Sequence, residues 1–182
     1  MIYRYNELRK IKQYGQHIKI EEALKAKKLF KFENSLYSEN EYTSELEIIA
    51  KLYEDAIFIG HSAFFYHGLT NIIPKHYYLN TKRKARKIND NRVKQTFSMD
   101  DYFEVGKTTL NYNNVEIVIY DKERMLIEVV RNKNTLPFDM YKEIIENYRR
   151  KIGKINMLKV EEYLDLFKNN DNLFNVIQLE VL

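Results

Sequence analysis

Two runs of basic side chains are the residues of this chain whose type and spacing suit binding chemistry. Between Met1 and Ser38 the sequence has nine Lys or Arg and four Glu, a balance of +5. Between Lys75 and Lys94 it has eight Lys or Arg and one Asp, a balance of +7. The remaining residues are net acidic, so the total charge is only +4. Two separated basic runs are typical of a protein that binds a polyanion, although lysines that only keep the surface hydrated give the same pattern.

The first run lies in a segment whose pattern predicts two helices and a small hairpin. Residues 6–14 and 20–28 have apolar side chains along one side, and residues 29–37 contain two short β-rich pieces around a turn at Asn34-Ser35. Helix, helix and hairpin is the element order of a minimal winged helix-turn-helix, so we predict a DNA-binding module over residues 1–40. Its candidate phosphate contacts, with an ordinary charged helix face as the alternative, are Lys19, Lys25, Lys28 and Lys31.

These side chains favour contacts with phosphates over the reading of base edges, because lysine offers a point charge and few geometric constraints. Basic residues of the preceding helix, Arg9, Lys10 and Lys12, would add to the same charge. Binding of this kind depends strongly on salt and discriminates little in a single copy. A homodimer or a pair of half-sites is therefore the expected arrangement on DNA.

The second run is densest in TKRKARKINDNRVK, from Thr81 to Lys94, between two predicted strands. In that place it is expected to form a protruding loop or hairpin. It could hold nucleic acid or an acidic surface of a protein partner, and a hydrated loop without a role is the alternative. The candidate polyanion- or partner-binding residues are Lys82, Arg83, Lys84, Arg86, Lys87, Arg92 and Lys94.

Residue types used in catalysis are present without the spacing that catalysis needs. His61, His67 and His76 match no regular metal-binding pattern, and Ser62 beside a histidine is better explained as a helix cap than as a nucleophile. We therefore expect no catalytic residue, no metal and no other cofactor. A metal-dependent nuclease remains the alternative, since carboxylates and a lysine stand near one another, although not as an acid-x-lysine pair on one strand, at Glu116, Asp121 and Lys122.

We predict an α+β domain over residues 41–182. Its helices and strands must position the second basic run and the residues just named. Ser44 is placed to cap a helix, Gly68 to end a short helix in a left-handed conformation, and Asn113-Asn114 to turn a hairpin. Asp121 is placed to cap a helix in which Glu123 complements the helix dipole and Arg124 can reach a carboxylate elsewhere, tying the helix to the sheet. We expect a mainly antiparallel sheet packed with C-terminal helices, one of which repeats apolar residues at Met157, Val160, Leu164 and Phe167.

Composition indicates a cytoplasmic protein without a membrane segment. The chain has 182 residues and no cysteine, which fits a reducing compartment. No apolar run approaches the roughly 18–20 residues that span a bilayer, and no apolar signal core follows the basic start.

Four motifs are distinctive: LYS (Leu36–Ser38), SAFFYHGLTNIIP (Ser62–Pro74), VEIVIYDKERML (115–126) and YKEIIENYRR (141–150). In these motifs, and in their order, the chain resembles the AbiEi family of antitoxins from bacterial type IV toxin–antitoxin and abortive phage infection systems. The residues that carry the family signature, with structural roles, are Ser62, His67, Gly68, Pro74, Glu123 and Arg124.

The resemblance implies a non-enzymatic, two-domain transcriptional regulator. An N-terminal winged helix would bind operator DNA and repress the operon, and a C-terminal domain would counter a cognate nucleotidyltransferase toxin. A carboxylate-rich, magnesium-binding toxin site would suit the basic run after Thr81. The chain departs from the family in two ways: it has room for two helices where a winged helix has three, and its wing turn, Glu33-Asn34-Ser35, has no glycine. A partner-binding protein that has lost DNA binding is therefore a further alternative.

Overall fold

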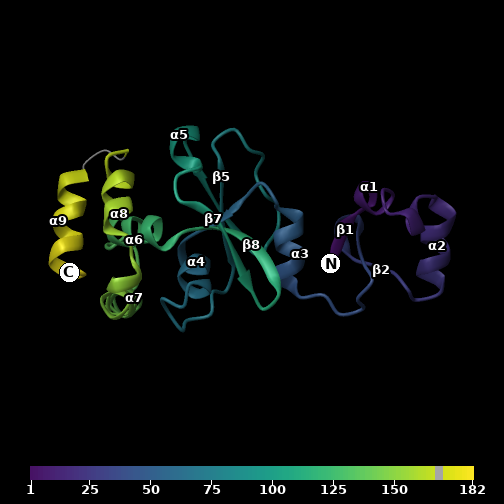
Figure 1. The fold of residues 1–182 in the computed structure, drawn as a ribbon, viewed down its shortest axis with the longest axis horizontal. Coiled ribbons are helices and arrows are strands. Elements are labelled where there is room, and N and C mark those ends of the chain that lie inside the picture. Colours follow the sequence, from purple (N-terminus) through teal and green to yellow (C-terminus); the bar gives the residue numbers. More distant parts are fainter. Residues whose placement is uncertain (167–169) are drawn as a thin grey trace. The chain divides into compact units, whose positions relative to one another are not determined.

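The computed structural model describes residues 1–166 and 170–182, so the predicted apolar position Phe167 lies outside the described residues. The chain divides into two compact units, an N-terminal unit (Met1–Glu54) and a C-terminal unit (Asp55–Leu182), which are described separately below (Figure 1). Both units mix helices and strands, and each contains one sheet.

The N-terminal unit has a three-stranded antiparallel sheet in the order β1-β3-β2. Its elements are β1 (Ile2–Arg4), α1 (Tyr5–Leu8), η1 (Lys12–Tyr14), α2 (His17–Lys25), β2 (Phe30–Lys31), η2 (Glu33–Ser35), β3 (Leu36–Ser38) and α3 (Glu45–Leu52). The hairpin and the second helix were predicted, whereas the single helix predicted over residues 6–14 is split into α1 and η1. Strand β1 was missed, because three residues are too few to show an alternating pattern.

The core of this unit explains why its short helices are stable. Leu8 of α1, Tyr14 of η1, Ile20 of α2, Leu29 before β2 and Tyr37 of β3 are buried together. Each isolated helix is shorter than the roughly 12–15 residues that would hold a helix in water, so burial of these side chains supplies the stability.

The boundary between the units comes after Glu54 and not after residue 40, because α3 packs on β1. The guanidinium of Arg4 donates from Nη2 to the backbone oxygens of Lys51 at 2.9 Å and of Leu52 at 3.1 Å, the last turn of α3. Lys51 Nζ in turn lies 2.8 Å from the carboxylate of Glu7. The predicted helix start is confirmed, since Ser44 Oγ accepts from the amide of Glu47 at 3.2 Å.

The C-terminal unit contains a five-stranded sheet in the order β6-β5-β4-β8-β7. Its strands are β4 (Ile57–Phe58), β5 (Tyr77–Lys82), β6 (Val93–Ser98), β7 (Lys107–Tyr112) and β8 (Val115–Tyr120). The sheet is mixed and not mainly antiparallel as predicted, since β4 pairs with β8 and β5 with β6 in parallel. The parallel pairs arise because the connections before β6 and before β7 carry the chain back along the sheet. The predicted β7–β8 hairpin is confirmed, with Asn113 and Asn114 at φ 50° and 65°.

The helices of this unit are α4 (Gly60–Tyr66), α5 (Asp100–Phe103), α6 (Lys122–Arg131), α7 (Phe138–Arg150), η3 (Ile152–Lys154), α8 (Met157–Leu164) and α9 (Asn170–Glu180). The C-terminal helices α6 to α9 gather to one side of the sheet, whereas α4 and α5 pack against β5 (Figure 1). Helix α6 packs against α4, α7, α8 and α9, and it is buried continuously from Arg124 to Val130. It therefore forms the centre of the helical layer. No helix in the described part of the chain is long and apolar enough to cross a bilayer.

Candidate nucleic-acid interfaces

The four lysines predicted to contact DNA are all exposed on the N-terminal unit. Lys19 and Lys25 lie on α2, Lys28 follows the end of α2, and Lys31 lies on β2. Lys19 and Lys25 are six residues apart and so point about 120° away from each other around the helix. A single surface laid against α2 would therefore meet these two lysines at its margins.

The exposed side of α2 is not uniformly basic. Glu21 and Glu22 are exposed on the same helix, and the imidazole Nδ1 of His17 lies 3.6 Å from the carboxylate of Glu21. With a neutral His17 the formal charge of α2 is zero, two lysines against two glutamates. The sequence-based count over Met1–Ser38 did not show this, because it averaged the helix with its flanks.

Positive charge concentrates instead in the segments on either side of α2. All of the following side chains are exposed: Arg9, Lys10, Lys12, Lys27, Lys28 and Lys31. Lys27 was not among the candidates, and its backbone takes the left-handed conformation at φ 53°, directly after the helix. The wing turn uses the same conformation, with Asn34 at φ 50° and Ser35 at φ 57°. Asparagine tolerates this region better than most residues, so the turn forms without glycine.

The second basic run does not form a hairpin in the C-terminal unit, because the strands on either side of it run parallel. Residues 83–92, named here the basic crossover, carry the chain from the end of β5 back to the start of β6. Gln95 holds its middle: the side-chain oxygen accepts from the amide of Ile88 at 2.8 Å, and Nε2 donates to the backbone oxygen of Arg86 at 3.1 Å and to Thr81 Oγ1 at 2.8 Å.

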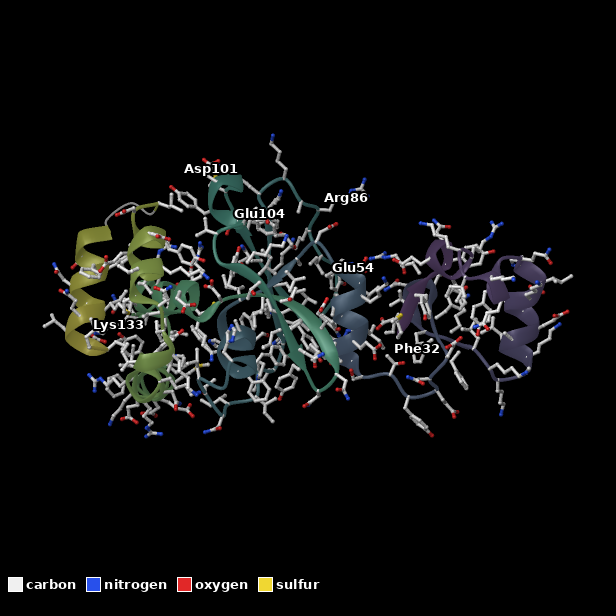
Figure 2. The ribbon with its side chains drawn as sticks, viewed as in Figure 1. Phe32, Glu54, Arg86, Asp101, Glu104 and Lys133 are labelled. Carbon is white, nitrogen blue, oxygen red and sulfur yellow. The ribbon has the colours of Figure 1, made fainter. Side chains whose placement is uncertain are left out.

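The seven predicted residues of this run fall into two groups. Two are paired with carboxylates: Lys82 Nζ lies 3.5 Å from Glu104, and Arg92 Nη2 lies 2.7 Å from Asp90. The others, which have no ion pair with any described residue, are exposed; they are Arg83, Lys84, Arg86, Lys87 and Lys94. Figure 2 shows Arg86 extending away from the crossover, with Glu104 beside α5.

The signature residue Ser62 has a different role from the one predicted. Helix α4 begins at Gly60, so Ser62 lies inside it and does not cap it. Its buried Oγ accepts from the amide of Tyr78 at 2.9 Å and lies 3.4 Å from the backbone oxygen of His76. Ser62 therefore fixes α4 to the start of β5. Gly60, at the start of this helix, takes a left-handed φ of 55°, which glycine adopts without a steric penalty and which the sequence pattern did not indicate.

The end of α4 is as predicted. Gly68 is left-handed at φ 62°. Its amide donates to the backbone oxygen of Phe65, and the amide of Leu69 donates to that of Phe64; these two hydrogen bonds define a Schellman motif. His67 Nε2 lies 2.7 Å from the backbone oxygen of Tyr120, at the end of β8. Burial lowers the pKa of the His67 imidazole, because the charged ring would lose its hydration. The neutral ring, donating from Nε2, thus joins α4 to the sheet.

The segment from Gly68 to Asn71 is held by three residues spaced four apart, two on α7 and one, Lys151, directly after its end. Glu143 accepts from Thr70 Oγ1 at 2.5 Å and from the amide of Asn71 at 3.0 Å. Asn147 Nδ2 donates to the backbone oxygen of Leu69 at 3.0 Å, and Lys151 Nζ to that of Gly68 at 2.5 Å. These three residues, Glu143, Asn147 and Lys151, are named here the clamp. The exposed Ile72 and Ile73 and the half-buried Pro74 of the signature follow the segment that it holds. The four-residue spacing of the clamp residues, on α7 and at its end, was the signal that sequence analysis overlooked.

Asp121, Glu123 and Arg124 all hold elements together. Asp121 caps α6 through the amide of Arg124 at 2.8 Å, and its other oxygen accepts from Lys159 Nζ at 2.6 Å and Tyr163 OH at 2.9 Å. Glu123 accepts from the amide of Asn156 at 2.9 Å, ahead of α8.

Arg124 does bind a carboxylate, but that of Glu128 on its own helix, with Nη2 at 2.8 Å. Its contacts with other elements include the bond from Nη1 to the backbone oxygen of Tyr102 at 3.3 Å and the ring of Tyr120 on β8, whose centroid lies 5.0 Å from the guanidinium. Glu128 lies one helical turn after Arg124, so the expected ion pair between α6 and another element is replaced by an ion pair within α6.

The side chains named for the nuclease alternative, Glu116, Asp121 and Lys122, do not converge on one site. Glu116 is exposed on β8, five residues before Asp121, a span of about 16 Å along an extended chain. Lys122 is partly exposed, and its backbone oxygen accepts from Tyr148 OH. Within the described residues, no three His, Asp or Glu side chains come together in a way that could hold a metal ion.

Comparison of the chain with models of known protein families and with curated proteins finds no match to either. The likeness to AbiEi antitoxins therefore depends on the motifs quoted above, and the activity that it implies enters below as a proposal.

Proposed function

We propose that this chain is a cytoplasmic, non-enzymatic antitoxin of the AbiEi type. In this proposal the N-terminal unit binds promoter DNA and represses the chain's own operon, and the C-terminal unit counters a nucleotidyltransferase toxin. The observation that carries the proposal is the topology of the N-terminal unit: a helix pair lies between the first and second strands of a sheet ordered β1-β3-β2.

That topology supports a winged helix. In that fold the sheet has the same strand order, and the last two strands, which follow the helix-turn-helix, make the wing. In this comparison α1 and η1 take the place of the first helix, α2 that of the recognition helix, and β2 and β3 those of the wing. The third helix of the fold, for which residues 1–40 have no room, is supplied by α3. Because α3 contacts β1 through Arg4, the N-terminal unit extends to Glu54 and not only to residue 40.

The charge distribution favours binding through phosphates. Because α2 itself is neutral, most of the attraction would come from Lys27, Lys28 and Lys31 after it and from the basic turn before it. Glu22 on the exposed side of α2 would oppose close approach to a phosphate. Such an interface has modest specificity in one copy, so we expect a homodimer on two half-sites.

Replacement of Lys25 and Lys28 by alanine is expected to weaken binding to the fragment upstream of the gene. If both side chains contact phosphates, the slope of log K against log salt falls by about 2, roughly 0.9 for each contact. Fluorescence anisotropy with a labelled duplex, from about 50 to 200 mM salt, measures both quantities.

Glu22→Gln is the matched variant, because it removes a negative charge from the same helix and should tighten binding. If all variants bind as the wild type does, α2 is not the recognition helix. If the wild type shows no preference for the promoter fragment but still protects cells from the toxin, the chain is a partner-binding protein without DNA binding.

Co-expression tests the other half of the proposal. We expect the gene beside this one to encode a nucleotidyltransferase that stops growth when expressed alone and loses that effect when this chain is present. Colony counts over a range of inducer concentrations give the size of the rescue, and the Lys25/Lys28 double variant expressed from an unrelated promoter should rescue fully. Toxicity that persists at equal expression of both proteins would contradict the proposal.

A further inference from the structure

We infer that the basic crossover and Phe97 together form a binding site for single-stranded nucleic acid on the C-terminal unit. This site is separate from the residues proposed to bind promoter duplex, and it does not depend on them. Its ligand is recognised by an exposed aromatic ring beside clustered cations, without any base-specific contact.

The crossover is held in place, although it is exposed. At its start, the amide of Arg83 donates to Ser98 at 2.8 Å. In the middle, Gln95 binds the backbone at Arg86 and Ile88. At its end, the amide of Tyr77 donates to the backbone oxygen of Arg92 at 2.7 Å. A segment fixed at three points loses little conformational entropy when it binds a ligand.

Its charge is available to a ligand. Asp90 is the acidic residue of the crossover, and it is occupied by Arg92 of the same turn. Lys84, Arg86 and Lys87 are exposed, with no ion pair to any residue that the structure describes. Three cations within four residues form a local phosphate-binding surface.

Phe97 lies between two of the points that hold the crossover. Side chains alternate along β6, so Phe97 and Gln95 lie on the same face of the strand, whereas Lys94 lies on the other. Gln95 binds the crossover at Arg86, and Ser98, next to Phe97, binds it at Arg83. The Phe97 side chain is 49% exposed, so an aromatic face is available beside the cations.

The exposed ring of Phe97 distinguishes among the polyanions that could bind the basic crossover. To an acidic protein surface, the half-exposed phenyl ring offers only apolar contact area, which a leucine would offer as well. In a duplex the bases are already stacked, so the ring has no free base face to meet. An unpaired base can stack on Phe97 while its phosphates reach the cations, which is how proteins hold single strands without sequence preference.

The test uses the full-length protein and labelled oligouridine or oligothymidine of about 12 nucleotides, with a mixed-sequence duplex of equal length for comparison. Phe97→Ala is expected to weaken single-strand binding roughly tenfold, the effect of losing one stacking contact. Arg86→Ala with Lys87→Ala should lower the salt slope by about 1.4, or 0.7 for each phosphate contact on a single strand. Promoter-duplex binding should be unchanged in all of these variants.

Phe97→Leu separates stacking from simple apolar contact, since it keeps an apolar side chain of similar size and exposure. It should behave as Phe97→Ala does, and circular dichroism melting should match the wild type, because Phe97 is half exposed. If the Phe97 variants bind single strands as well as the wild type does, the inference fails, and a purely electrostatic surface for a protein partner replaces it. Equal losses with the duplex overturn it as well, in favour of a second duplex site.

Discussion

Arg124→Ala is expected to destabilise the C-terminal unit by about 3–5 kcal/mol, the cost of breaking a buried ion pair from one side. The Arg124 side chain is 2% exposed and that of Glu128 is 11% exposed. Among the residues that the structure describes, the remaining partners of the Glu128 carboxylate would be Arg131 at 3.3 Å and Asn132, at the C-terminal end of α6. The backbone oxygen of Tyr102 would also lose its contact with Nη1, and the ring of Tyr120 would lose the cation that lies 5.0 Å from its centroid.

Calorimetric melting of the purified protein measures this change, because the transition of the C-terminal unit should move down. The double variant Arg124→Met with Glu128→Leu is the matched control. It replaces both charges by apolar side chains of similar length, and such replacements are often neutral or stabilising. A loss below about 1 kcal/mol for Arg124→Ala would mean that water reaches Glu128 and that the pair is not buried in solution.

Gly106→Ala is expected to cost about 3 kcal/mol or more, for two separate reasons. Gly106 has φ 77°, a conformation that costs other residues roughly 1–2 kcal/mol. A Cβ at this position would also lie 2.5 Å from Arg124 Cβ and 3.0 Å from Asp121 Oδ1. Relief of that overlap would shift the helix start that Asp121 caps, a strain of about 1–3 kcal/mol.

Gly153→Ala is the control for this substitution, since no atom lies within 4 Å of the position that its Cβ would take and its φ is not in the left-handed range. It should leave the melting temperature unchanged or raise it slightly. If Gly106→Ala melts at the same temperature as Gly153→Ala, then the close approach of residue 106 to α6 is not maintained in solution.

The features that sequence analysis predicted correctly are those decided by neighbours along the chain. The cap at Ser44, the cap at Asp121, the left-handed Gly68 and the Asn113-Asn114 turn each depend on residues within one turn of the backbone. The dipole, hydrogen-bond and φ preferences of these residue types act at that range, so a pattern in the sequence is enough to locate them.

The features that it missed depend on contacts between distant segments. Strand β1 exists because Ile2 to Arg4 pair with residues 36–38, and the unit boundary moves because Arg4 reaches the end of α3. The parallel pairing of β5 with β6 likewise has no signal in local alternation, which is the same for both directions. Charge counts have a similar weakness, since they do not show that Glu21 and Glu22 share α2 with the lysines.

The clamp on residues 68–71 has a consequence for the length of α7. Glu143, Asn147 and Lys151 face this segment together only because they are four residues apart, and each added residue turns a helix by about 100°. One inserted or deleted residue between Glu143 and Lys151 would rotate part of the clamp toward solvent. The segment bearing Ile72 and Ile73 would then come loose although none of its own residues had changed. Length variants of this gene should therefore be tolerated at the turn between α6 and α7 and not within α7.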